Sequence, residues 1–307
     1  MLQRLFRNLS VLWLLLPGLP VVAMEVSSGK LMTLPAFEFH DIAARPVHVW
    51  LPEGYPSQQP YSVLYMHDGQ MLFDRRTTWN KQEWGVDEVA AELQRQGKVK
   101  PFIVVAIENI SETRHQDYFP QKARALMPET AQAQQHPFNQ AELRADNYLK
   151  FLVTQVKPYI DRNFQVARDA SHTFIAGSSM GGLISLYATL EYPEVFSAVA
   201  AISTHWPGIG PEDKLPVAAS IRAYLEQNLP EPGTHRFYFD YGTKTLDAYY
   251  PPLQQQVDTI MQQAGYHSPD WQTRAFEGHA HDEDSWRLRL AEPLLFLLGS
   301  DTPVQPR

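Results

Sequence analysis

A regular alternation of short apolar runs with longer amphipathic stretches is the strongest constraint on the fold. Several of the apolar runs have no polar face, which is typical of strands in a parallel sheet covered by helices on both sides. The predicted strands are residues 47–51, 62–66, 102–107, 172–176, 198–203, 236–241 and 271–276.

The stretches between these runs show helical spacing. In the longest, residues 142–164, the side chains that share one face are Tyr148, Phe151, Leu152, Val156, Tyr159 and Ile160. The predicted helices are residues 86–96, 142–164, 181–192, 216–228 and 252–264, and a last one from about residue 283. Such alternation predicts a doubly wound α/β architecture with helices on both faces of a mostly parallel sheet. No repeat or linker interrupts it, so we expect one domain over residues 24–307.

The segment of residues 111–140 departs from this alternation. It is polar, rich in Gln and Pro, and too long for an ordinary connection. Loops of this length inside a domain are usually either functional or disordered. Two interpretations stay open, a surface insertion without a fixed structure and a flap over the functional site.

The first 23 residues have the pattern of a secretory signal peptide. Arg4 and Arg7 form a positive start, a Leu-rich core covers residues 11–17, and residues 21–23 read Val-Val-Ala, with small residues suited to signal peptidase. An uncleaved anchor is the alternative, but the apolar core is too short to span about 30 Å of hydrocarbon. We therefore expect export, cleavage, and a periplasmic or secreted protein with no membrane attachment.

Charge and cysteine content exclude several classes of function. The chain has 34 acidic against 26 basic residues, a formal charge of −8, so its surface would repel phosphate backbones and we expect no nucleic-acid partner. It contains no cysteine, which excludes a thiol nucleophile, a Cys-ligated zinc and disulfides.

The motif with the clearest chemistry is Gly177-Ser178-Ser179-Met180-Gly181, a G-x-S-x-G sequence. A predicted strand leads into it and a predicted helix follows, which is the arrangement of a nucleophile elbow. The sharp turn forces the third residue into a strained backbone conformation, and the flanking glycines leave room that a Cβ would block. Ser179 is therefore the predicted nucleophile, and the N–H of Met180 at the helix start is a predicted oxyanion donor.

A serine hydroxyl needs a histidine to accept its proton. Where a serine nucleophile lies on such a strand-turn-helix elbow, the chain order is serine, acid, histidine. The histidines after Ser179 are His205, His235, His267, His279 and His281. His279 and His281 share the loop of residues 277–283 between the last strand and the last helix, the position that the fold gives to the base. From the residues alone, both are candidates.

The same loop admits a metal-site interpretation. His279-x-His281 followed by carboxylates could ligate zinc. However, Glu283 stands where the H-x-H-x-D pattern of metallo-hydrolases has an aspartate, and further ligands are not recognisable. We therefore favour a site without metal or cofactor.

The acid is expected after the strand at residues 236–241, where Asp240 and Asp247 are the candidates. Asp240 lies within the strand, whereas Asp247 follows Gly242 and Thr243 in a loop from which it could reach an imidazole. We therefore predict that Asp247 orients the base.

A second oxyanion donor is expected after an early strand. His67-Asp68-Gly69-Gln70 ends such a strand, and the N–H of Gln70 is the predicted donor, although a plain turn is the simpler interpretation of an Asp-Gly pair.

These blocks together resemble the esterase D family, which includes feruloyl esterases, enterobactin esterases, S-formylglutathione hydrolases and mycolyltransferases. The resemblance runs from about residue 47 to residue 298 and is carried by VLYMHDGQMLFD, TTWNKQEWGVDE, FLVTQVKPYIDRNF, FIAGSSMGGLISLYATLEYPEVFSAVAAISTHWP, YGTKTLDA and HAHDEDSW. It implies an α/β-hydrolase fold and serine esterase activity on a small-molecule or carbohydrate ester. It further implies Ser179 as nucleophile, His281, five positions before Trp286, as base, and Asp247 as acid.

The resemblance leaves the substrate open among carbohydrate, feruloyl-type and siderophore esters. Candidate substrate contacts are Trp84, Arg114, Tyr118, Trp206 and, as a neighbour of the base, His279. Aromatic faces stack on sugar or phenolic rings, although the same residues also pack in cores. An acyltransferase with the same triad and a non-catalytic binding protein on the same fold are the alternatives.

Overall fold

An eight-stranded sheet is the centre of the structure, a computed structural model that describes residues 23–132, 142–208 and 216–300. The strands are β1 (Lys30–Thr33), β2 (Val47–Leu51), β3 (Ser62–His67), β4 (Phe102–Ile107), β5 (Thr173–Ser178), β6 (Ala198–Ile202), β7 (Arg236–Gly242) and β8 (Trp271–Phe276). Their order is β1-β2-β4-β3-β5-β6-β7-β8. β2 is antiparallel to β1 and β4, and the other pairs are parallel, as the buried strand pattern predicted.

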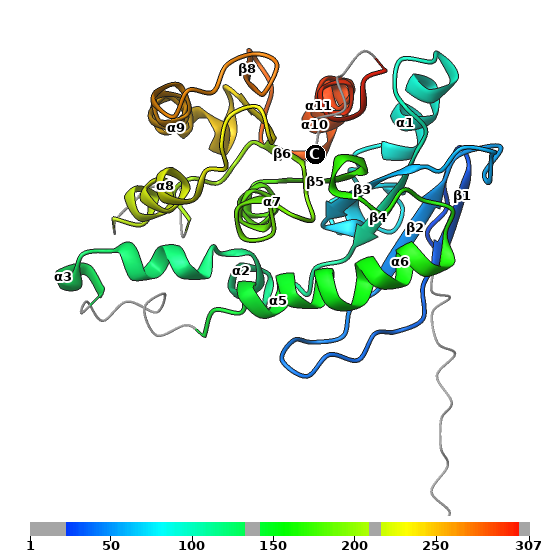
Figure 1. The fold of residues 1–307 in the computed structure, drawn as a ribbon, viewed down its shortest axis with the longest axis horizontal. Coiled ribbons are helices and arrows are strands. Elements are labelled where there is room, and N and C mark those ends of the chain that lie inside the picture. The colour runs from blue at the N-terminus through cyan, green and yellow to red at the C-terminus, as the bar shows by residue number, and fades with distance from the viewer. Residues whose placement is uncertain (1–22, 133–141, 209–215, 301–307) are drawn as a thin grey trace, which may run out of the picture.

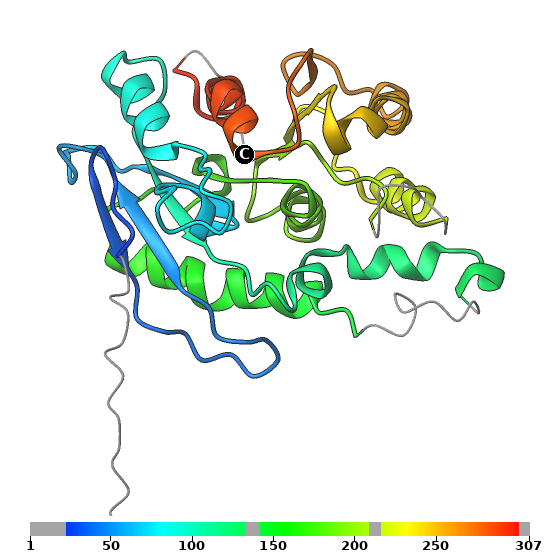
Figure 2. The same cartoon turned by 180° about the vertical axis from the view of Figure 1, so that it is seen from behind.

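Helices cover both faces of this sheet (Figures 1 and 2). The bounds are α1 (Val86–Arg95), α2 (Arg114–Tyr118), α3 (Glu129–Gln132), α5 (Ala145–Phe151), α6 (Lys157–Asn163), α7 (Met180–Glu191), α8 (Val217–Asn228), α9 (Pro251–Gln263), α10 (Glu283–Arg289) and α11 (Ala291–Leu298), with short 3₁₀ segments η1 (Gly69–Met71), η2 (Gln121–Leu126), η4 (Ala170–His172) and η5 (Thr245–Tyr249). The predicted α/β class is confirmed.

Two hydrophobic layers hold the helices against the sheet. In β3, Val63 and Tyr65 face the layer that contains α5 to α9, whereas Leu64 and Met66 face the layer that contains α1, α10 and α11. Side chains of a strand alternate between faces, so each central strand contributes to both layers. This explains why the central strands carry apolar side chains on both faces.

Two helical elements differ from the sequence prediction. Residues 142–164 form α5, a π-helical turn (Leu152–Val156) and α6 in place of one regular helix. The last helix is divided into α10 and α11. The edge strand β1 was not predicted, because three of its four residues are exposed and it lacks the apolar pattern used to find strands.

The described part of the segment at residues 111–140 is folded. It contains α2, η2 and α3, and it contributes the buried side chains of Tyr118, Phe119 and Ala123 to the core. An insertion without fixed structure was therefore the wrong interpretation for residues 111–132. Residues 133–140 lie outside the described residues.

No helix among the described residues has the length and apolarity required to cross a membrane. The predicted signal peptide at residues 1–23 lies, except for its last residue, outside the described residues.

The parallel strands bring the predicted site residues to one edge of the sheet. β3, β5, β6, β7 and β8 all end at that edge. The segments that follow them contain Gln70, Ser179, Ser203, Asp247 and His281. Parallel α/β sheets place their ligand sites at this carboxyl edge.

Candidate active site

Ser179 occupies a strained turn between β5 and α7. Its backbone angles, φ 58° and ψ −122°, are a conformation that side-chain-bearing residues rarely adopt. The Ser179 N–H donates to the carbonyl of Ile202 on the neighbouring strand at 2.9 Å. A Cβ on Gly177 would lie only 2.6 Å from the carbonyl oxygen of Gly181. The turn therefore has the geometry predicted from the motif, including the need for glycine at position 177.

Asp247, in η5, holds the imidazole of His281. Asp247 Oδ1 lies 2.6 Å from His281 Nδ1, and the carboxylate is fully buried. Its other oxygen, Oδ2, accepts hydrogen bonds from Gly242 N and Ser203 Oγ, both at 2.6 Å. Burial by itself would raise the pKa of Asp247, but the hydrogen bonds from His281 and Ser203 outweigh it and hold the pKa below its ordinary value. Asp247 is therefore an ionised partner for an imidazolium.

Two aromatic rings fix the plane of the His281 imidazole. Tyr250 and Trp286 both meet it edge to face, with ring centroids 5.7 and 5.1 Å away and interplanar angles of 79° and 77°. The His281 N–H donates to Thr245 Oγ1 at 2.8 Å, which anchors the loop. With Nδ1 held by Asp247, the ring can rotate little.

Ser179 and His281 line the same cleft, which has a volume of about 580 Å³. Among the described residues, Ser179 Oγ makes no hydrogen bond to the His281 ring; it interacts instead with the hydroxyl of Tyr250. That hydroxyl is 2.8 Å from Nδ1 of His205, a buried histidine whose pKa burial lowers to about 3. A hydrogen bond from Ser179 Oγ to His281 would require the serine hydroxyl to turn away from Tyr250, an adjustment that is common in active sites without substrate.

The backbone N–H groups of Met180, next to Ser179 in the chain, and of Gln70, which lines the same cleft, have no hydrogen-bond partner among the described residues. Met180 is the first residue of α7, so its N–H lies at the positive end of the helix dipole. Gln70 lines the cleft, and its Oε1 accepts a hydrogen bond from Asn109 N at 3.1 Å. At Gly69, a Cβ would lie 2.8 Å from the backbone of Ala106, so the loop requires glycine to pack against β4.

The predicted substrate contacts divide into two groups. Trp84 and Arg114 line the cleft. Arg114 is paired through Nε and Nη2 with both oxygens of Asp68, each at 2.8 Å. Burial alone would raise the pKa of Asp68, but the guanidinium of Arg114 keeps it below its ordinary value. The charge of Arg114 is thus largely compensated inside the site.

Tyr118, Trp206 and His279 are not among the residues that line the cleft, so the cleft itself gives no support to their predicted contact with substrate. Tyr118 is fully buried, and Trp206 is buried with its Nε1 donating to Gln254 at 2.8 Å. His279 packs its ring against Phe276 with centroids 5.5 Å apart, while its carbonyl accepts from two backbone N–H groups. All three contribute to packing or loop structure.

Sequence reasoning missed several residues of the site. Trp79 lines the cleft with 84% of its surface exposed, and Asn80 donates to Glu283 across the cleft at 2.7 Å. Trp79 and Asn80 belong to the TTWNKQEWGVDE block, in which Trp84 alone was predicted to have a role. Ser203 was missed because it lies 44 residues from its partner Asp247 in sequence.

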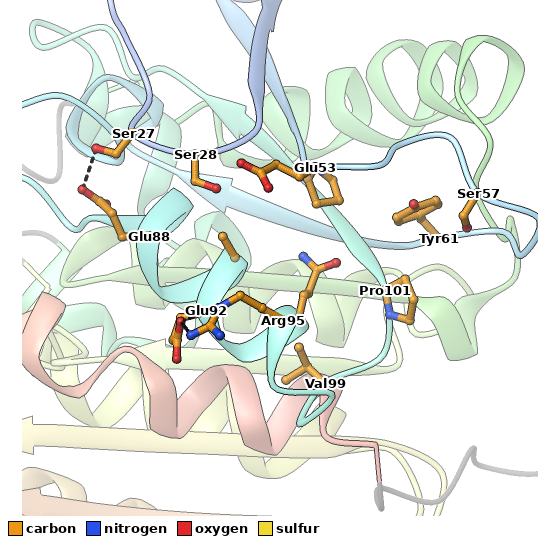
Figure 3. A pocket seen from close by; sticks show the side chains of 13 residues that line it. Ser27, Ser28, Glu53, Ser57, Tyr61, Glu88, Glu92, Arg95, Val99 and Pro101 are labelled. Atoms are coloured by element: carbon orange, nitrogen blue, oxygen red, sulfur yellow. Dashed lines mark hydrogen bonds and ion pairs between the residues drawn. The ribbon is translucent and has the colours of Figure 1, made fainter.

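A larger cavity of about 670 Å³ lies away from these residues (Figure 3). It is lined by residues that precede β3 and β4, Tyr61 and Pro101, and by α1 residues such as Glu88 and Glu92. It therefore opens near the amino ends of the strands, whereas Ser179 lies at their carboxyl ends. None of the predicted site residues lines it.

Among the described residues, no group of three or more His, Cys, Asp or Glu side chains is arranged to hold a metal ion. His279 and His281 have different partners, the Phe276 ring and the Asp247 carboxylate.

Comparison with known proteins finds relatives whose names describe esterases. The chain is 27% identical over 194 residues to the ferri-bacillibactin esterase BesA of Bacillus subtilis, covering 58% of this chain and 62% of BesA. It spans about 60% of the length of the curated relatives it matches first.

Solved structures show the same fold at lower identity. A ferulic acid esterase superimposes with a TM-score of 0.61 at 22% identity, covering 88% of this chain and 98% of that one. The enterobactin esterase FES of Shigella flexneri gives 0.62 at 18% identity, covering 89% of this chain and 60% of FES. The architecture is thus the α/β-hydrolase fold. The family model described as "Putative esterase" matches residues 43–297, so the chain belongs to this esterase family.

Proposed function

We propose that this protein is a carboxylic-ester hydrolase that uses Ser179 as nucleophile, His281 as base and Asp247 as the partner of His281. The observation that carries the proposal is the convergence on one cleft of a strained serine and a histidine whose Nδ1 is held at 2.6 Å by a buried carboxylate. With Nδ1 protonated and facing Asp247, Nε2 is left as an acceptor for the Ser179 proton.

The reaction would proceed through an acyl-enzyme. Ser179 Oγ attacks the ester carbonyl while His281 takes its proton, and the N–H groups of Met180 and Gln70 stabilise the oxyanion. His281 then gives the proton to the leaving alcohol. Water, activated by His281, hydrolyses the acyl-enzyme and restores the serine. No cofactor enters these steps.

Turnover of p-nitrophenyl acetate by the purified protein tests this proposal. Ser179→Ala should abolish turnover, whereas Ser178→Ala, the adjacent serine, should keep it above one tenth of the wild-type rate. A fluorophosphonate probe should label the wild type and fail to label Ser179→Ala. Unchanged turnover in Ser179→Ala would defeat the assignment, and a folded wild type that is neither active nor labelled would favour the binding-protein alternative.

The acyltransferase alternative differs only in the second step, where an alcohol would replace water. Supplying candidate alcohols and measuring the transesterified product separates the two. Hydrolysis should dominate at alcohol concentrations in the millimolar range.

The charges of the cleft favour a neutral substrate that contains a ring. The described lining residues include the carboxylates of Asp68, Asp282 and Glu283 but one guanidinium, Arg114, which Asp68 already pairs. A polyanionic ferric siderophore would meet net negative charge there. The exposed indole of Trp79 supplies an apolar face that can stack on a sugar or phenolic ring.

A panel of acetylated sugars, feruloyl esters and ferric catecholate siderophores tests this preference. The neutral esters should give the higher kcat/KM, and Trp79→Ala should raise KM for them without changing p-nitrophenyl acetate turnover. Faster hydrolysis of the ferric siderophore would contradict the charge argument.

We also propose that residues 1–23 direct export and are then removed, which would place the enzyme in the periplasm or the medium. The support is the arrangement of Arg4, Arg7 and the short apolar core. N-terminal sequencing of the protein recovered from a bacterial periplasm should begin at Met24. Recovery of the full-length chain in the membrane fraction would favour the anchor.

A further inference from the structure

A buried cation lies directly behind the Asp247 carboxylate. Arg289, on α10, is 2% exposed, and its Nη2 lies 2.7 Å from Ser203 Oγ, 3.1 Å from Asp240 Oδ1 and 3.7 Å from Asp247 Oδ2. One guanidinium therefore contacts two buried carboxylates and the serine between them. Buried charges are rare unless they are paired, so this group has a specific electrostatic or structural role.

The hydroxyl of Ser203 has its full set of hydrogen bonds. Its two lone pairs accept from Arg289 Nη2 at 2.7 Å and from Trp286 Nε1 at 3.0 Å. A hydroxyl has one proton and two acceptor sites, so the remaining Ser203 proton has to point at Asp247 Oδ2, 2.6 Å away. Arg289 and Trp286 thus determine the direction of the hydrogen bond that Asp247 receives.

The opposite charge of Arg289 is supplied by Asp240. This carboxylate is fully buried; its Oδ1 accepts from Arg289 and Ser203 N, and its Oδ2 accepts from Tyr238 Oη at 3.1 Å. Burial raises the pKa of Asp240, and the charge of Arg289 opposes that rise. The sequence offered Asp240 as a candidate acid. In the structure Asp247 contacts the imidazole, whereas Asp240 contacts Arg289, which in turn lies against Asp247.

We propose, on the basis of the hydrolase function proposed above, that Asp240 and Arg289 are a pair of positioning residues that fix Asp247 through Ser203 and keep a net positive charge away from the ring of His281. Asp240 cancels the charge of Arg289. Without that cancellation, the guanidinium would oppose the imidazolium that forms when His281 accepts the Ser179 proton.

Helix α10 connects His281 to the two side chains that donate to Ser203. It begins two residues after His281, and Trp286 and Arg289 lie three positions apart, so they share one face of the helix. The same helix therefore follows the base and carries both donors to Ser203. The charged or titratable groups around the His281 ring are Asp247, Tyr250, His205, Arg289 and, on its own loop and helix, Asp282 and Glu283.

The test compares the pH dependence of kcat/KM for p-nitrophenyl acetate in the wild type, Asp240→Asn and Asp240→Asn/Arg289→Met. Asp240→Asn leaves the guanidinium with Asp247 as its remaining carboxylate partner and adds a net positive charge beside His281, so the acid limb of the profile should move to lower pH by roughly half a unit to one unit, with at least a tenfold loss of kcat at neutral pH. Removing both charges should return the limb to within about 0.2 units of the wild type. A merely structural pair would lower activity without moving the limb.

Two further variants keep the proposal testable if Asp240→Asn folds poorly. Arg289→Lys retains the charge, but its shorter side chain has no counterpart of Nη2, which reaches both Ser203 and Asp240, so kcat should fall while the limb stays in place. Arg236→Met is the matched control, because Arg236 is also a buried arginine, and it donates to the carbonyls of Phe296 and Leu297 away from the cleft. It should lower the unfolding temperature and leave the pH profile unchanged.

The outcomes separate this inference from the function on which it rests. An inactive, unlabelled wild type overturns the hydrolase function itself. An active wild type in which Asp240→Asn leaves the acid limb unmoved, or in which the double variant shifts it further, overturns the role of the pair alone.

Discussion

Replacing Asp247 by Asn should invert the tautomer of His281. Gly242 N can only donate, and Ser203 Oγ donates because its lone pairs are occupied, so both partners of Asp247 Oδ2 require an oxygen at that position. The amide oxygen of the variant would satisfy them, which places the NH₂ group 2.6 Å from His281 Nδ1 in the observed geometry. Nδ1 would then have to accept, and the ring proton would move to Nε2, where it blocks transfer from Ser179.

The opposite amide orientation carries a penalty of its own. With the NH₂ group facing Gly242 N, two donors would meet in a buried position, and an unsatisfied buried donor costs about 1–3 kcal/mol. The unproductive tautomer is therefore favoured by a similar amount. The same substitution in other serine-histidine-aspartate enzymes lowers kcat by about 10⁴, equivalent to about 5.4 kcal/mol of barrier. We expect a loss of 10³ to 10⁴ in kcat here.

The measurement is steady-state hydrolysis of p-nitrophenyl acetate by Asp247→Asn, with KM and unfolding temperature determined in parallel. KM should change less than threefold. The protein should stay folded, because the asparagine side chain keeps hydrogen bonds to all three partners of Asp247, which are Gly242, Ser203 and His281. Asp258→Asn is the control: Asp258 accepts from Gln254 and Thr273 away from the cleft, so its loss should leave kcat within twofold. A decrease of less than tenfold for Asp247→Asn would refute the tautomer argument.

Three further predictions follow from other contacts. Gly177→Ala should lower the yield of folded protein and abolish activity, because its Cβ would lie 2.6 Å from Gly181 O; wild-type activity would contradict the packing at the elbow. Gln70→Pro removes one N–H group and should reduce kcat 10²- to 10³-fold, whereas Gln70→Ala keeps that N–H and should reduce it less than fivefold; equal losses would exclude an oxyanion role. Asp74 accepts hydrogen bonds from Arg76, and these bonds are the main reason that the pKa of Asp74 is lowered to about 2. The contribution of Asp74 to folding stability is therefore complete above about pH 4 and is lost as the pH falls through about 2. Thermal unfolding of Asp74→Asn should therefore show a deficit at pH 7 that disappears near pH 2.

The sequence was informative wherever the constraint is local. The seven predicted strands lie within about two residues of β2 to β8, because a buried strand must be apolar on both faces. Ser179 could be identified in the same way, since the strand, the glycines and the helix that create its turn are adjacent in the chain. The π-helical turn at Leu152–Val156 could not be predicted, because the apolar periodicity on either side of it continues with little change.

Aromatic residues show where local reasoning is insufficient. Trp79, Trp84, Tyr118 and Trp206 all lie outside the predicted strands and helices, yet Trp79 is 84% exposed in the cleft whereas Trp206 is buried in the core. An indole packs equally well against protein or ligand, so its residue type does not predict its location. Their positions depend on which loops the sheet brings together.

By itself the sequence determined the α/β class, the strained serine turn and, through short motifs, the residues that could serve as acid and base. Tertiary structure decided which of them meet: Asp247 and His281 are 34 positions apart, and Ser203 and Arg289 are 86 apart. Parallel strands end at one edge of the sheet, so side chains distant in sequence converge there, and hydrogen-bond geometry at that edge then distinguishes Asp247 from Asp240. Turn strain is a property of neighbouring residues, whereas the pairing of buried charges depends on how the whole chain folds.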